Sequence, residues 1–466
     1  MKSYGGKESR FGLRSARPWV RALSFAVLGA SLLLSGTVAG VCFRIYRANA
    51  RESTTGLPYH PQPGPHDRVL VVAPHCDDET LGCAGVLQHA VGAGGEVLVV
   101  FVTSGDGFGL AAWQSNPGVR LRPRHFMALA VRRQREARAA LAHLGISSNR
   151  VVFLGYPDRG IAHLWLNYWS SSQPYTSPYT RVSRCPYRDA RRPGTPYAGE
   201  NLLRDLEELI REFQPTRIYG PSPNDDHPDH WASACFVRAA VERLGLEERV
   251  PFFTYLVHHG DWPVPQGMHP HLGLAPPASL ARLDTLWSAF PVDEETLDSK
   301  EAALNEYRSQ MVMRRFLLSF LRKTELFGRF PAPVECAPAP PNLRIDGRAD
   351  EWGAIHRAIQ EPIEEWLPTE MEGAADLTSI RFCQDDEHLY LLLTSRRKVS
   401  GRLRYQLRLR TLDEDPRALE IVVRPGKPAE GLASAVGVYG QHIEVAVPLE
   451  RLGGARSLMI GAVART

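Results

Sequence analysis

The chain has 466 residues, more than one compact domain usually holds, and its hydrophobic content of 44% and charged content of 23% are typical of a globular protein. The net charge of +4 is small for this length and argues against a nucleic-acid-binding protein. The seven cysteines form no CxxC pair, which argues against a disulfide scaffold or a cysteine-only zinc module.

The first distinct feature is an uncharged apolar stretch, residues 22–43. At about 1.5 Å per residue it is long enough to cross a hydrocarbon core of roughly 30 Å as one transmembrane helix. Basic residues dominate residues 1–21, so the positive-inside rule predicts a cytoplasmic tail and an exported body, periplasmic or extracellular. A cleaved signal peptide is the alternative, because the stretch is rich in Ala, Ser and Gly. Residues 44–66 contain four prolines and are expected to be an extended linker.

Residues 67–328 alternate between strand and helix patterns. Continuous apolar runs predict strands that are buried on both faces. The predicted strands are 68–73, 96–103, 151–155 and 216–220, and the predicted helices are 126–144, 201–213, 230–244 and 297–327. This order predicts an α/β fold, with a Rossmann-like, mainly parallel sheet sandwiched by helices. Residues 106–127 and 159–199 show no clear period and are expected to be long loops.

A proline-rich segment, residues 329–341, marks the clearest domain boundary. In residues 342–466 short strand patterns follow one another without helices, which predicts a C-terminal β-sandwich domain. The predicted strands there are 389–393, 403–409, 419–423, 443–447 and 458–463.

Two polar clusters each follow a predicted strand. They are HCDDE (residues 75–79) and NDDHPDH (residues 224–230). Ligands of open α/β sheets bind at the carboxyl ends of the strands. Imidazoles and carboxylates in this combination suit Zn²⁺ or another first-row metal. Either cluster alone is equally well explained as a helix cap, but two clusters at two strand ends favour a metal site.

These motifs resemble the N-acetylglucosaminyl-phosphatidylinositol de-N-acetylase family, also called PIG-L or LmbE-like. The resemblance covers roughly residues 67–328 and is carried by APHCDDETLGCAG (73–85), HPDHWA (227–232), RRQREARAALAHLG (132–145), FLGYPDRG (153–160) and KEAALNEYRSQ (300–310). One departure is Cys76, which stands where the family commonly has Pro. A thiol there makes the loop a candidate for oxidation or for a second metal.

The resemblance implies a metal-dependent deacetylase site. Its metal ligands are His75, Asp78 and His230, which would hold Zn²⁺, with Fe²⁺ or another divalent ion as the alternative. Two histidines and one carboxylate leave coordination positions for water and substrate.

The catalytic roles implied by the resemblance fall on Asp77, His227 and Asp229. Asp77 would be the general base, and His227 would stabilise the oxyanion or protonate the departing amine, with Asp229 orienting it. These roles match what amide hydrolysis requires, namely an activated water, a stabilised oxyanion and a proton for the leaving group.

Arg133 and Asp158 are the residues implied to bind substrate. A surface ion pair between Arg133 and Glu136, three residues apart, is the alternative for the arginine. For His258 and His259 the favoured interpretation is ordinary, partly exposed histidines.

The C-terminal region resembles family 9 carbohydrate-binding modules in IDGRADEW (345–352), DDEHLYLLL (385–393) and HIEVAVPLERLG (442–453). The alternative is that these residues only build the sandwich, with Trp352 in its core. Trp366, Tyr405 and Tyr439 are candidates for stacking on sugars.

Taken together, the sequence predicts a membrane-anchored, metal-dependent N-deacetylase. Its substrate would be an N-acetylglucosamine-containing glycolipid or glycan, which it would convert to a free amine and acetate. The alternatives are a deacylase of a small N-acyl metabolite and a membrane-tethered glycan-binding protein without catalysis.

Overall fold

The computed structural model describes residues 56–465 apart from 282, 284, 330–333, 357, 362–369, 414–415 and 432. The predicted cytoplasmic tail and transmembrane anchor lie outside the described residues. None of the helices within the described ranges is both long and apolar enough to cross a membrane. The residues from Ser53 to Thr466 form one compact unit.

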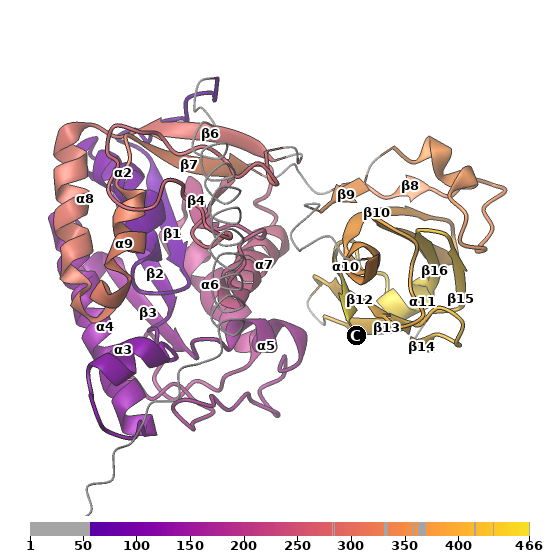
Figure 1. Ribbon diagram of the computed structural model, residues 1–466, viewed down its shortest axis with the longest axis horizontal. Helices are drawn as coiled ribbons and strands as arrows, with labels where there is room; N and C mark the ends of the chain where they lie inside the picture. Colours follow the sequence, from indigo (N-terminus) through magenta and orange to yellow (C-terminus); the bar gives the residue numbers. More distant parts are fainter. Residues whose placement is uncertain are drawn as a thin grey trace, which may run out of the picture. The chain divides into compact units, whose positions relative to one another are not determined.

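A seven-stranded sheet lies at the centre of the α/β part, in the order β3-β2-β1-β4-β5-β7-β6 (Figure 1). Its strands are β1 (Arg68–Ala73), β2 (Glu96–Thr103), β3 (Val151–Tyr156), β4 (Arg217–Pro221), β5 (Phe252–Tyr255), β6 (Leu286–Pro291) and β7 (Thr324–Arg329). Strands β1 to β5 are parallel, and β7 runs antiparallel to β5 and β6. The mainly parallel sheet and its first four strands are therefore confirmed, while β5, β6 and β7 were not predicted.

Helices cover both faces of this sheet (Figure 1). Side chains of β1 alternate between two apolar cores, as expected for a strand buried on both faces: Val69 and Val71 lie in one, Leu70 and Val72 in the other. The first core includes residues of α2 (Asp78–Gly92), α4 (Pro123–His143) and α8 (Glu294–Glu306), and the second includes residues of α6 (Gly199–Phe213) and α7 (Pro228–Arg243). The predicted helices 126–144, 201–213 and 230–244 correspond to α4, α6 and α7.

The prediction of one long helix over 297–327 is wrong. Helix α8 ends at Glu306, and short turns follow, namely η2 (Arg308–Met313), α9 (Arg314–Leu317) and η3 (Leu318–Phe320), before β7. Tertiary contacts override the helical period: Gln310 hydrogen-bonds the loop after β1, and β7 pairs with β6. The two predicted loops also contain short helices, α3 (Gly109–Gln114) and α5 (Ile161–Leu166).

The end of the predicted linker 44–66 is not a free tether. Tyr59 bridges Ala289 of β6, and the backbone N–H of His60 donates to the Ala289 carbonyl at 2.8 Å. The His60 ring is buried between Phe253 and Phe327, and its nitrogens lie 2.9 Å from Ser288 Oγ and Tyr219 Oη. This segment therefore belongs to the folded domain.

Two sheets make up the C-terminal part. One has the order β15-β16-β11-β10-β8 with β9 beside β10, and the other has the order β14-β13-β12-β17. Their strands are β8 (Ala337–Pro338), β9 (Ala358–Gln360), β10 (Leu377–Gln384), β11 (His388–Ser395), β12 (Arg404–Thr411), β13 (Ala418–Val423), β14 (Glu430–Gly431), β15 (Ala435–Tyr439), β16 (His442–Pro448) and β17 (Leu458–Arg465). Leu391 and Ile443 of the first sheet share a core with Leu407 and Ile421 of the second, as in a sandwich. The five predicted strands are β11, β12, β13, β16 and β17.

The aromatic residues of this part have different environments. Trp352 is buried and donates through Nε1 to Glu444 Oε1 at 2.5 Å, so it belongs to the framework. Tyr405 is buried as well, which removes it from the candidates for sugar stacking, whereas Tyr439 is exposed. Trp366 lies outside the described residues.

Candidate metal centre and active site

The two polar clusters meet at one edge of the sheet. The chain order β3-β2-β1 runs one way and β4-β5 the other, so the direction reverses between β1 and β4. Side chains that follow these neighbouring parallel strands converge outside their carboxyl ends. The HCDDE cluster follows β1 and leads into α2, and the NDDHPDH cluster follows β4 and leads into α7.

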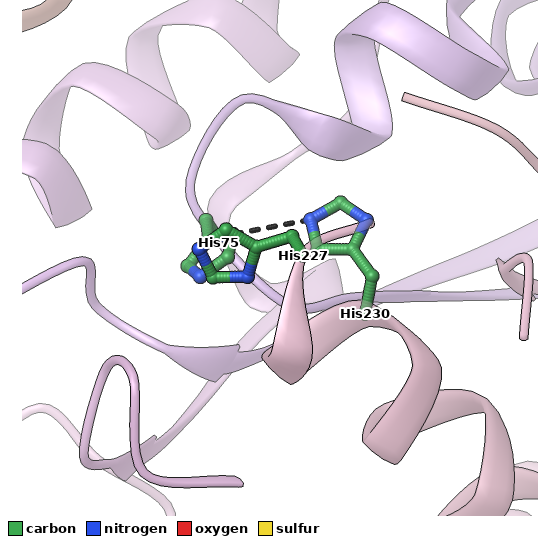
Figure 2. Close-up of side chains that lie close together, drawn as sticks. All are labelled: His75, His227 and His230. Carbon is green, nitrogen blue, oxygen red and sulfur yellow. Dashed lines mark hydrogen bonds between the residues drawn. The ribbon is translucent and has the colours of Figure 1, made fainter. Parts of the chain in front are cut away.

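Donor atoms of the three predicted ligands face one another. His75 Nδ1 lies 3.2 Å from Asp78 Oδ2 and 3.2 Å from His230 Nε2, and His230 Nε2 lies 3.1 Å from Asp78 Oδ2. Figure 2 shows the rings of His75 and His230 joined by this contact, with His230 on α7. Ligands bonded at about 2.1 Å to a tetrahedral ion are about 3.4 Å apart, so this set fits Zn²⁺ or a similar ion.

The far nitrogen of each histidine faces a carboxylate. His75 Nε2 lies 3.3 Å from Asp158 Oδ1 and 3.3 Å from Asp229 Oδ2. His230 Nδ1 lies 3.1 Å from Asp225 Oδ2. Such carboxylates fix the ring orientation and tautomer of metal-binding histidines, and they increase the basicity of the ligand nitrogen.

In the structure the carboxylate of Asp229 contacts His75, whereas the predicted role of Asp229 was to orient His227. Its carboxylate bonds to His75 and accepts the backbone N–H groups of Arg159 at 2.6 Å and Ile161 at 3.0 Å, instead of orienting the His227 ring. Only its backbone N–H reaches His227, at Nδ1, over 3.2 Å. The side-chain partner of the Asp229 carboxylate is thus His75, which is distant in the chain, and not the neighbouring His227.

Asp225 is a further residue of the candidate site and was not predicted from the sequence. It is buried, and it accepts backbone N–H groups of His227 at 2.9 Å, Val257 at 3.1 Å and His258 at 2.9 Å, besides facing His230. Its position in the acidic NDDHPDH cluster, five residues before His230, could have indicated a role at the site. The sequence does not show, however, which aspartate of the cluster points toward His230.

Charge explains the protonation behaviour of the ligands. Burial raises the pKa of Asp78, but the opposing charge of His230 and the bonds from His230 and His75 bring it well below its usual range. Burial lowers the pKa of His230, but Asp225 and Asp78 raise it to about 10. Burial likewise lowers the pKa of His75, which Asp158, Asp229 and Asp78 raise well above its usual value. This acidic surrounding holds positive charge at the point where the donor atoms meet.

Asp77 is partly buried, lies next to this point and differs from Asp78. Burial and the charge of Asp78 raise the pKa of Asp77 to about 6, against a lowering by Arg133. Arg133 Nη2 lies 3.6 Å from Asp77 Oδ1, and the guanidinium also donates to the carbonyls of Gly105 at 3.3 Å and Cys76 at 3.4 Å. Arg133 is thus held beneath the HCDDE loop that follows β1. The alternative ion pair with Glu136 is not formed, since Glu136 bonds Arg132 and Ser309.

The carboxylate of Asp158 is also hydrogen-bonded to groups of the protein. It is buried, its Oδ1 faces His75, and its Oδ2 accepts the Gly107 backbone N–H at 2.8 Å. Its own backbone N–H donates to Asp106 Oδ1 at 3.0 Å. Burial and the Asp158 charge raise the pKa of Asp106 to about 7. In this structure Asp158 connects the loop after β2 to His75, and its predicted contact with substrate stays a prediction.

His227 completes the cluster. Its ring lies beside that of His75 (Figure 2), edge-on and with centroids 4.6 Å apart. Its Nδ1 accepts the Asp229 N–H as the N-cap of α7. Because Nδ1 accepts, the proton of the neutral ring is on Nε2. Burial and the charges of His75 and His230 lower the pKa of His227 to about 2. His227 is therefore a neutral hydrogen-bond donor.

The segment that follows α8 supports the HCDDE loop from behind. Gln310 Nε2 donates to the Cys76 carbonyl at 2.6 Å, and the Tyr307 hydroxyl donates to Glu79. Burial raises the pKa of Glu79 to about 8. Cys76 itself is fully buried, and burial raises the pKa of its thiol well above the usual value, which argues against the expected sensitivity to oxidation.

His258 also lies at the site. Its ring centroid is 4.8 Å from that of His230, its face stacks on Phe316, and it forms a possible metal-binding group with Asp78 and His230. Burial and the charge of His230 lower the pKa of His258 to about 4. His258 therefore belongs to the candidate site and is not an ordinary surface histidine. His259 lies apart from this group and faces Ser279 and Asp226.

Comparisons with known proteins bear on the α/β part. Residues 70–241 match the model of the PIG-L family, described as GlcNAc-PI de-N-acetylase. The 1D-myo-inositol 2-acetamido-2-deoxy-alpha-D-glucopyranoside deacetylase of Mycobacterium sp. (strain KMS) is 31% identical over 192 residues, which are 41% of this chain and 54% of that protein. The chain thus spans about half the length of this curated relative.

Two solved structures are more distant. The zinc-inhibited form of teicoplanin deacetylase Orf2 is 20% identical, with a TM-score of 0.37, and covers 57% of this chain and 99% of that one. The N,N'-diacetylchitobiose deacetylase from Pyrococcus horikoshii is 17% identical, with a TM-score of 0.33, and covers 57% and 84%. The family model and the mycobacterial relative support, for the α/β part, the PIG-L/LmbE-like resemblance that the sequence motifs indicate.

Proposed function

We propose that this chain is a metal-dependent de-N-acetylase, which hydrolyses the acetamide of an N-acetylglucosamine-containing glycolipid or glycan to a free amine and acetate. One observation carries the proposal: the donor atoms of His75, Asp78 and His230 lie within 3.2 Å of one another beside the carboxylate of Asp77. We assign these three residues as the ligands of one divalent ion, Zn²⁺ or alternatively Fe²⁺. Such an ion would lower the pKa of a water molecule and polarise the amide carbonyl.

The residues around the donors supply the proton transfers. Asp77, whose pKa of about 6 lies near neutrality, takes a proton from the attacking water and passes it to the departing amine nitrogen. His227 is held neutral with its proton on Nε2, so it donates a hydrogen bond to the oxyanion that develops on the acetyl carbon. Arg133 keeps Asp77 in place from below.

The proposed substrate class is supported by the mycobacterial relative and by the sequence outside the described residues. The mycobacterial relative is named for an N-acetylated sugar joined to inositol. The apolar stretch of residues 22–43 favours a membrane-anchored enzyme with an exported catalytic domain, and hence a glycolipid or cell-envelope glycan. Because this relative is named for a small N-acetylated compound, a small N-acyl metabolite is the second candidate substrate.

The C-terminal sandwich would hold the enzyme on a glycan and raise its local concentration there. Of the predicted stacking residues that the structure describes, Tyr439 is the exposed one, and it would supply such a contact; the Arg348 guanidinium lies 4.6 Å from its ring centroid. A glycan-binding protein without catalysis is the competing function, and the convergence of donors and base at one point argues against it.

Acetate release tests the proposal. The panel contains N-acetylglucosaminyl-phosphatidylinositol, the N-acetylglucosaminyl inositol without lipid, and N-acetylglucosamine oligomers, each with added Zn²⁺ or Fe²⁺. Release that the Asp77→Asn variant lacks, although it binds metal as the wild type does, is the expected result. No release from any member by a metal-loaded enzyme would contradict the proposed substrate class.

A further inference from the structure

Two segments next to the site carry exposed apolar side chains. Trp113 and Leu110 of α3 are 56% and 44% exposed, and Met313 and Val312 of η2 are 42% and 39% exposed. Helix α3 packs against both η2 and α4, so these side chains belong to one region of the surface. Scattered exposed apolar residues need no explanation, but four on two contacting elements form a patch.

Both segments border the catalytic residues. The ring of Phe108, directly before α3, lies 5.8 Å from the Arg133 guanidinium that pairs with Asp77. Gln310 of η2 donates to the Cys76 carbonyl, and Phe316, just after η2, stacks on His258. The patch therefore forms part of the rim around the predicted metal centre.

The same segments are basic and contain no acid. Residues 107–135 and 307–324 include no Asp or Glu. Five exposed arginines lie on or near these segments. Arg120, Arg122 and Arg124 lie between α3 and the first turn of α4, and Arg314 and Arg315 directly follow η2. No ion pair to a carboxylate is found for these five within the described ranges of the chain. We call these arginines together with Leu110, Trp113, Val312 and Met313 the rim patch.

We propose that the rim patch docks on an anionic lipid bilayer and brings the mouth of the site to the membrane surface. Arginines attract acidic headgroups, while tryptophan and aliphatic side chains enter the interface between headgroups and acyl chains. A second copy of this chain fits less well, because like charges would meet across the contact. An aqueous polyanion would use the arginines but not the apolar residues. The inference concerns binding and does not depend on the proposed hydrolysis.

Vesicle binding tests the inference on residues 53–466, which form one compact unit and lack the predicted anchor. Thermal unfolding of this fragment should first be shown to be cooperative. We expect it to sediment with phosphatidylcholine vesicles that contain 30% phosphatidylglycerol and not with pure phosphatidylcholine. Replacing three arginines (Arg120→Ala, Arg314→Ala and Arg315→Ala) should weaken binding by about tenfold or more, and so should Trp113→Gln with Met313→Gln.

Matched controls separate the patch from general surface effects. Tyr59→Gln with Leu286→Gln removes two apolar residues that are even more exposed, and Lys398→Ala, Arg402→Ala and Arg451→Ala together remove three exposed charges elsewhere. Both controls should bind as the unmodified fragment does. Three results would overturn the proposal: no binding at low salt, an equal loss in the controls, or unchanged binding of the Trp113→Gln, Met313→Gln variant. The last result would identify a polyanion site instead of a bilayer site.

Discussion

The Nε2 atom of His75 lies 3.3 Å from Asp229 Oδ2, although the two residues are 154 positions apart in the chain. This bond joins the loop after β1 to the first turn of α7, the two segments that supply the proposed metal ligands. It leaves Nδ1 of His75 directed at Asp78 and His230.

Asp229→Asn should therefore weaken metal binding, because the amide cannot hold His75 as a charged carboxylate does. Loss of a carboxylate behind a metal-binding histidine typically costs about 10- to 100-fold in affinity. Competition with a chelator would measure the metal affinity of the variant and of the wild type. His227→Gln is the matched comparison, since it should lose turnover and keep its metal. An unchanged affinity in Asp229→Asn would return Asp229 to the role of orienting His227.

Metal affinity should rise with pH. In the metal-free protein Asp225 and Asp78 raise the pKa of His230 to about 10, so a proton occupies the ligand at neutral pH and must leave when metal binds. Each proton released makes affinity increase by up to about tenfold per pH unit. Asp225→Asn should lower this pKa and flatten the dependence between pH 6 and 8. Identical slopes in both proteins would show that His230 binds metal without losing a proton.

Removing one partner of the buried ion pair beneath α2 should strongly destabilise the protein. Lys300 and Glu325 are both fully buried and 2.8 Å apart; Lys300 Nζ also donates to the Leu81 carbonyl, and Glu325 accepts the backbone N–H groups of Gly85 and Val86. Lys300→Met alone should lower the free energy of unfolding by about 3–5 kcal/mol, because it leaves a buried charge unpaired.

The double variant Lys300→Met, Glu325→Leu should recover part of this loss in urea unfolding. A double variant that is as unstable as the sum of two single variants would mean that the two residues act independently.

His60 should make the protein sensitive to acid. Burial, with a smaller effect of Arg217, lowers the pKa of His60 from 6.5 to about 3, so the unfolded chain takes up a proton there before the folded one does. Its contribution to stability is therefore lost as pH falls from about 6.5 to about 3, by up to about 1.4 kcal/mol per pH unit. His60→Gln should flatten this part of the stability curve, whereas exposed His66→Gln should leave it unchanged. Parallel curves for all three proteins would exclude His60 as the acid-sensitive group.

Much of the α/β part could be predicted from local patterns. Val69 to Val72 are all apolar because β1 is buried on both faces, and the clusters after β1 and β4 converge because parallel neighbours end at the same edge. The three proposed ligands, identified by resemblance, lie together in the structure.

What the sequence did not give depends on contacts between distant residues. Asp229 lies beside His227 in the chain, and only the fold turns its carboxylate to His75. The sequence pattern predicts that Gln310 belongs to a long helix, and only the structure shows its hydrogen bond to the Cys76 carbonyl. The inward turn of Asp225 depends in the same way on the backbone N–H groups of Val257 and His258.

Metal stoichiometry tests the central claim most directly. Protein freed of metal would be titrated calorimetrically with Zn²⁺, in the wild type and in the Asp78→Ala and Asp77→Asn variants. One ion per chain in the wild type, a large loss of affinity in Asp78→Ala and near-normal binding in Asp77→Asn are the predicted results. No stoichiometric binding in the wild type, or unchanged binding in Asp78→Ala, would contradict the assignment of His75, Asp78 and His230 as the metal centre.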